Sequence, residues 1–197
     1  GIRKFNPDGS QGDGKLVPMN YSKRLLGQLN LSFFPSSSIK MNAELLYSTN
    51  NYKDYNHFFK LNPDGDVKKF NKSYNATFTL THTLSSKSFY VLKVSNFFRD
   101  FNEKLYDDPY DPRYLHPDSL RTVGYAFASK GTNLHRYFRT TNSLIGKLDF
   151  TSQITDKHMI KFGIEGRWHK LKVDDYNLEP LRVNGIPVEP FVPSIPE

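Results

Sequence analysis

The sequence lacks several features that define common protein classes. It contains no cysteine and a single tryptophan, Trp168, among 197 residues. The absence of cysteine excludes disulfide scaffolds and thiolate metal sites. No apolar run approaches the ~20 residues that a membrane-spanning helix needs, and no basic-then-apolar leader follows Gly1. Any crossing of a membrane would therefore have to use strands.

Signals for catalysis, metal binding and nucleic-acid binding are also missing. The sequence offers no nucleophile with a base, no glycine-rich phosphate cradle and no paired carboxylates, so we predict neither an enzyme nor a cofactor. The six histidines are dispersed without zinc spacing, which predicts no metal site. The net charge of +7 comes from scattered lysines and arginines rather than a basic block, so we expect no nucleic-acid partner.

What the sequence does contain is long stretches that alternate apolar with polar residues. Odd positions are apolar over residues 25–33 and 39–47, and Pro35–Ser38 separates the two stretches. Even positions are apolar over residues 74–84 and 90–98, and again over 144–154 and 160–168. Short polar turns join the members of each later pair, at Ser85–Ser88 and Thr155–His158. The pattern predicts three β-hairpins.

The lengths of these stretches and of their connections suggest a membrane barrel. Each stretch runs for roughly ten residues, whereas strands of soluble proteins typically have ~5 or 6 and transmembrane strands ~9 to 11. Short turns alternate with long loops, as in outer-membrane barrels. We therefore predict an all-β fold, an antiparallel up-and-down meander of about six long strands that forms a sector of a large transmembrane β-barrel. Its extracellular loops would cover residues 1–22, 50–72, 99–141 and 174–197.

Charged residues within the predicted strands occupy the polar positions, which would face the barrel lumen. We expect them to be structural rather than selective, because half-wet ion pairs contribute about 1 kcal/mol or less. These lumen-facing charges are Lys40, Glu44, Lys93, Lys147, Asp149, Lys161, Glu165 and Arg167.

One long loop combines carboxylates, aromatic residues and prolines. A loop of this kind can contact a solute or close over it, although a proline-stiffened surface loop is the alternative. We expect a short helix over Leu115–Thr122, and hairpin tips at the near copies Asn6–Gly9 and Asn62–Gly65. The candidate ligand-binding residues are Tyr106, Asp107, Asp108, Tyr110, Asp111, Arg113 and Tyr114.

Several phrases resemble TonB-dependent outer-membrane receptors, particularly those with a carboxypeptidase-regulatory-like domain before the plug. His158–Arg167 is similar to a recurrent strand of that family. Asp111–Tyr114 and Gly124–Phe127, followed by Tyr137–Asn142, are similar to a long extracellular loop that descends into the next strand. The 197 residues contain no recognisable plug or energy-coupling box, and six strands are far fewer than the ~22 of such transporters. We therefore expect one sector of the barrel.

The resemblance implies active uptake of a scarce nutrient across the bacterial outer membrane. The nutrient would be an iron chelate, a cobalamin-like cofactor, a glycan or a peptide. The implied partners are outer-membrane lipid, the rest of the barrel with its plug, and an inner-membrane energy-coupling protein that acts through the plug. Two alternatives stay open: a soluble carbohydrate-binding β-sandwich, and a surface adhesin or docking protein.

Overall fold

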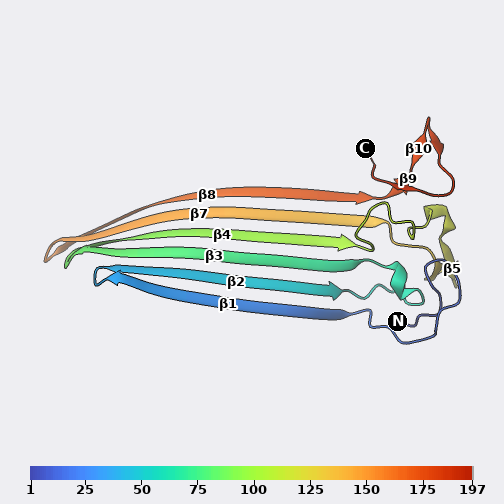
Figure 1. Cartoon of the computed structure of the whole chain (residues 1–197), viewed down its shortest axis with the longest axis horizontal. Coiled ribbons are helices and arrows are strands. Elements are labelled where there is room, and N and C mark those ends of the chain that lie inside the picture. The colour runs from blue at the N-terminus through green and yellow to red at the C-terminus, as the bar shows by residue number, and fades with distance from the viewer. Residues whose placement is uncertain (197) are drawn as a thin grey trace.

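One sheet of six long antiparallel strands dominates the computed structural model, which describes residues 1–196 (Figure 1). Neighbouring strands in the sheet follow the chain in the order β1-β2-β3-β4-β7-β8, which confirms the predicted all-β, up-and-down meander. The sheet is open, with β1 and β8 as its edges. The long strands are β1 (Tyr21–Ser36), β2 (Ile39–Lys53), β3 (Lys68–Ser85), β4 (Ser88–Lys104), β7 (His135–Thr155) and β8 (His158–Asn177).

The strands extend well beyond the alternating stretches that predict them. β8 has 20 residues and β7 has 21, although alternation is regular only over 160–168 and 144–154. The added segment Thr140–Asn142 of β7 is polar on both faces, and its partner on β8 reverses the pattern, with Leu171 and Val173 at odd positions. Alternation of apolar and polar residues shows that the two faces of a strand differ in polarity. Backbone hydrogen bonds between strands form whether or not the faces differ. The extracellular loops predicted from the pattern are therefore shortened to residues 54–67 and 105–134 between strands.

Three tight turns join the strands at one end of the sheet. They occupy Ser37–Ser38, Ser86–Lys87 and Asp156–Lys157, inside the predicted turn segments. The strand register shifts beside each turn, between Phe33 and Ser36 in the first hairpin. Such a bulge adds a residue to one strand and increases its twist. The long loops and both ends of the described chain lie at the opposite end of the sheet (Figure 1).

These connections form a layer that we call the loop layer, residues 1–20, 54–67, 105–134 and 178–196. The predicted helix over Leu115–Thr122 is wrong: the segment forms a single 3₁₀ turn, η2 (Pro117–Ser119), and then the strand β5 (Arg121–Val123), which pairs with β6 (Phe127–Lys130). No helix in the described part of the chain is long and apolar enough to cross a membrane. The other short elements are η1 (Pro63–Gly65), β9 (Glu179–Pro180), β10 (Arg182–Val183), β11 (Ile186–Pro187) and β12 (Pro193–Ser194).

The two Asn-Pro-Asp-Gly segments adopt different structures. Asn6–Gly9 makes the expected tight turn, closed by a bridge between Phe5 and Gln11. Asn62–Gly65 is not a hairpin tip, because it forms the buried turn η1, in which Asn62 is fully buried. Gly131 joins the copies: its amide donates to Pro7 O at 2.8 Å, and its carbonyl accepts from Asn62 Nδ2 at 3.0 Å.

Buried hydrophobic clusters lie in the loop layer rather than on the sheet. Met19, Phe59 and Ala128 form one cluster, and a second consists of Leu105, Tyr114 and Leu178. The buried ammonium of Lys53, at the end of β2, donates to Pro63 O at 2.6 Å and lies 4.0 Å from the Asp66 carboxylate. No second sheet within residues 1–196 packs against the six strands, so the described chain does not form a sandwich.

Candidate functional site

The strand register places the alternating apolar residues on one side of the sheet, which we call the apolar face. Phe33, Met41, Leu80, Leu92 and Leu148 lie side by side across β1 to β7, and Ile164 continues the row on β8. This face is formed by odd residues of the first hairpin and even residues of the other strands, as the sequence predicts. Its side chains are exposed: Phe33 is 64% exposed and Ile164 70%. That lipid covers this face is still a prediction.

Two rows of rings cross the apolar face, one near the turns on β3, β4, β7 and β8 and one near the loop layer on β2, β3 and β4. The turn-side aromatic row is His82, Tyr90, Phe150 and Phe162, in which the Tyr90 hydroxyl and His82 Nδ1 are hydrogen-bonded at 3.2 Å. The loop-side aromatic row is Tyr47, Tyr74 and Phe98, with the last two rings stacked at 5.4 Å. On β3 the rows are separated by the segment from Tyr74 to His82, nine residues when both ends are included. A tilted transmembrane strand uses ~9 to 11 residues.

The eight predicted lumen-facing charges share the opposite side, the polar face. Lys147 and Asp149 form an ion pair at 3.0 Å along β7, and Glu165 pairs with Arg167 along β8. Lys93 lies directly opposite Lys147, and Lys147 directly opposite Glu165. Glu44 accepts a hydrogen bond from Asn42 at 3.1 Å, Lys40 lies over the Phe34 ring, and Lys161 is opposite Thr151. This face is therefore hydrophilic, with most of its charge on β4, β7 and β8.

The candidate ligand-binding loop is partly built into the loop layer. Tyr114 is only 1% exposed, and its hydroxyl accepts hydrogen bonds from Arg136 at 3.0 Å and from the Tyr106 amide at 3.3 Å. Arg136, 3% exposed, also donates to Tyr106 O and Asp107 O, both at 2.9 Å. In this conformation Tyr114 anchors the loop to β7 and offers no surface to a solute.

The remaining candidates lie around this anchor. Asp111 and Arg113 are paired at 2.6 Å, and these hydrogen bonds lower the pKa of Asp111 below the usual range. The Arg113 guanidinium lies 4.0 Å from the centre of the Tyr106 ring, whose pKa is raised by burial. Asp107 forms an ion pair with Lys104 at 3.0 Å. Asp107, Asp108 and Tyr110 are all exposed. Tyr110 is thus the most accessible ring of the set.

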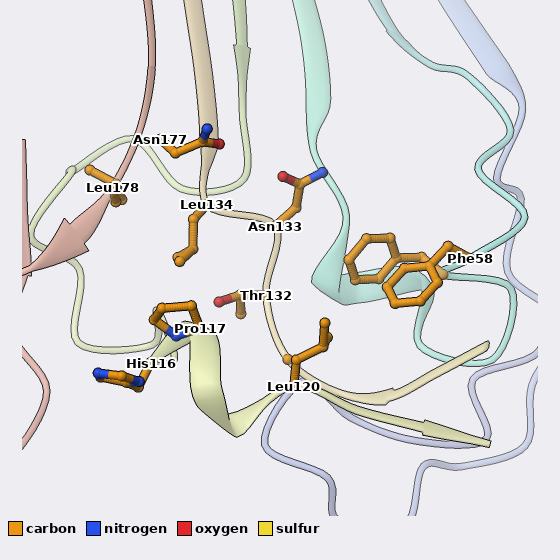
Figure 2. Close-up of a pocket in the computed structure, with 11 residues that line it drawn as sticks. Phe58, His116, Pro117, Leu120, Thr132, Asn133, Leu134, Asn177 and Leu178 are labelled. Atoms are coloured by element: carbon orange, nitrogen blue, oxygen red, sulfur yellow. The ribbon is translucent and has the colours of Figure 1, made fainter. Parts of the chain in front are cut away.

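A pocket of about 370 Å³ opens in the loop layer beside this loop (Figure 2). It gathers residues from three separate segments: the β2–β3 loop, the β4–β7 loop, and the end of β8 with the residue that follows it. Polar groups of His116, Thr132, Asn133 and Asn177 alternate around it with apolar groups. The apolar lining includes Phe58, Pro117, Leu120, Leu134 and Leu178. Such a mixture suits a small solute that has both apolar and hydrogen-bonding groups.

Sequence reasoning missed this pocket. His116 and Leu120 lie just beyond the predicted ligand-binding segment, and Asn177 ends a strand 61 residues after His116. No local pattern brings these segments together, because only the folded meander places the loop after β4 against the end of β8. Among residues 1–196 no group of three or more histidine or acidic side chains is arranged to hold a metal ion.

Comparison with known proteins gives no match to a family model, a curated protein or a solved structure.

Proposed function

We propose that the six long strands cross a bacterial outer membrane as a sector of the barrel of a TonB-dependent transporter. The observation that carries the proposal is the exposed apolar face crossed by two aromatic rows. Outer-membrane barrels have such an outward apolar band, with aromatic girdles at both membrane interfaces. The polar face would then line a wet lumen.

The borders of the apolar face favour lipid over a second protein layer. Beyond the loop-side aromatic row the same face carries Lys72, Asp100 and Lys172, although the strands continue for several more residues. A layer of hydrocarbon ends at a fixed depth along every strand, and charge is tolerated only beyond it. Lys72, Asp100 and Lys172 lie at one level across β3, β4 and β8, and packing against a second sheet would not require such an alignment.

The open edges favour a larger closed sheet. β1 and β8 have free backbone groups along 16 and 20 residues, and β8 contains no proline. Soluble proteins usually protect long edges, since unpaired strands promote aggregation. In a barrel the edges pair with further strands, and the polar face meets the plug and the solute. These are the partners that we propose, with the inner-membrane energy-coupling protein acting through the plug.

Transport in this proposal rests on the resemblance to TonB-dependent receptors. The loop layer would face outward and contact the nutrient before uptake, through the exposed Tyr110 and the pocket around His116 and Asn133. The nutrient stays within the classes named above: iron chelate, cofactor, glycan or peptide. No catalytic step is required.

The orientation is tested by labelling single cysteines in intact cells with a membrane-impermeant maleimide. The chain has no native cysteine, so each introduced thiol is a unique target. Tyr125, fully exposed in the loop layer, reports the outside, and Ser37, in the first tight turn, reports the periplasm. We expect labelling of Tyr125→Cys in intact cells, and of Ser37→Cys only after permeabilisation. Labelling of Ser37→Cys alone in intact cells would contradict the proposal.

A further inference from the structure

The apolar face ends in a group of lysines on the loop side, which we call the lysine collar. Level with the loop-side aromatic row and beyond it, the same side of the sheet carries exposed lysines on three strands and only two acidic residues, Asp100 and Asp174. The collar consists of Lys23 on β1, Lys68 and Lys72 on β3, and Lys170 and Lys172 on β8.

The collar has no counterpart at the other end of the apolar face. Beyond the turn-side aromatic row, the residues of this face on β3, β4, β7 and β8 are Leu84, Ser88, Ser152, Ile154, His158 and Ile160. None of these is a lysine, an arginine or an acidic residue; on this face of the described part of these strands, such residues return only in the turns themselves. The cationic character therefore belongs to one border of the apolar face and not to both.

Most collar lysines have no ionic partner of their own. Lys172 pairs with Asp174 at 3.1 Å, while Asp100 accepts hydrogen bonds from Asn102 and Thr140. Lys23, Lys68, Lys72 and Lys170 make no ion pair within residues 1–196. Lysine stems can lie along apolar surface while the ammonium reaches a polar layer. These four ammonium groups are thus available to an anion at this border.

We infer that the lysine collar binds the phosphate-bearing headgroups of anionic lipids in the membrane leaflet next to the loop layer. This inference rests on the proposed function, because the collar meets headgroups only if the apolar face meets acyl chains. The apolar face contacts the acyl chains of the lipid and the collar binds its phosphate, so one molecule contacts both surfaces. A soluble anion would contact the lysines but not the apolar face.

Trp168 provides a built-in reporter for this lipid. It is the only tryptophan of the chain, is 61% exposed on the apolar face, and precedes Lys170 by two residues on the same side of β8. A lipid whose phosphate is held by Lys170 places its acyl chains against the indole. Bromine atoms on those chains would quench its fluorescence.

The experiment reconstitutes the intact protein in vesicles that mix phosphatidylcholine with phosphatidylglycerol. In one preparation bromine is on the acyl chains of the first lipid, and in the other on those of the second. The signal that disappears in Trp168→Phe is assigned to Trp168. Each lysine near an anionic surface strengthens association about fivefold, so we expect stronger quenching by the anionic lipid and a several-fold weaker preference in Lys170→Gln. Lys161→Gln, on the polar face of the same strand, is the matched control and should leave the preference unchanged.

The outcomes separate this inference from the proposed function. Equal quenching by both lipids, or a preference that survives in Lys170→Gln, overturns the role of the collar while the apolar face still meets lipid. If neither brominated lipid quenches Trp168, the apolar face does not meet acyl chains, and the proposed function itself is wrong.

Discussion

At the scale of single residues, burial distinguishes groups that hold the loop layer from groups that could meet a solute. Tyr114 and Arg136 are almost fully buried and bonded to each other, whereas Tyr110 and Asp108 are exposed. The sequence assigns the whole cluster to ligand contact because it shows residue type and not accessibility. A polar aromatic residue is equally suited to a surface and to a hydrogen-bonded interior.

Arg136 should be the more sensitive member of this pair. Arg136→Leu removes hydrogen bonds to Tyr106 O, Asp107 O and the Tyr114 hydroxyl, and leaves these groups without their donor. We expect the local opening free energy of residues 105–116 to fall by about 2–4 kcal/mol. Hydrogen exchange of the Tyr106 amide, which donates to Tyr114, measures this loss.

The control for this prediction is Arg121→Leu. Arg121 is exposed and donates only to carbonyls of its own loop, Asp118 O and Leu120 O, so its removal should change exchange at Tyr106 little. Equal exchange in the two variants would mean that Arg136 does not hold the loop.

At the scale of elements, the two faces of a strand carry different side chains. In β7, Leu148 lies in the middle of the apolar face between Leu92 and Ile164, and its neighbour Lys147 lies on the polar face. Substitutions at these two adjacent positions therefore test the two faces separately. The comparison is direct because both residues lie at nearly the same point along the same strand.

Substitutions at these two positions should have unequal costs. If the apolar face meets lipid as proposed, Leu148→Arg places a charge in the membrane interior, which costs about 2–4 kcal/mol at the midplane of a barrel. Lys147→Ala removes a half-exposed ion pair with Asp149, worth about 1 kcal/mol or less. Urea unfolding of the protein in lipid vesicles measures both. Similar costs at the two positions would show that both faces meet the same medium.

At the scale of the whole molecule, the sheet is a single layer without a partner. Its apolar face and its two edges are all open in the described chain, while the buried hydrophobic clusters lie only in the loop layer. Soluble proteins rarely expose contiguous apolar patches of more than a few hundred Å². Such a molecule is stable only where another phase or chain covers the sheet.

We therefore expect the 197-residue chain by itself to aggregate in aqueous buffer and to disperse when detergent covers the apolar face. Sedimentation velocity in buffer with and without detergent measures this directly. A monodisperse monomer in buffer alone would contradict the membrane proposal and favour a soluble module.

The sequence by itself determined the six strands, their order of pairing and the division of residues between two faces. These features follow from local alternation and from turns a few residues long, so positions such as Leu148 and Lys147 could be assigned correctly. The ends of the strands could not, because the segment around Thr140 is polar on both faces and its partner after Lys170 reverses the alternation.

Only the tertiary structure decided which loop residues are buried and which gather around a pocket. Asn62 and Asn6 occupy near-identical segments, yet Asn62 is buried directly before a 3₁₀ turn and Asn6 lies in a surface turn, because different neighbours surround them. The pocket around His116 and Asn177 and the lysine collar likewise combine residues from strands that are distant in sequence. Contacts of this kind depend on how the whole meander aligns its strands, which no single segment encodes.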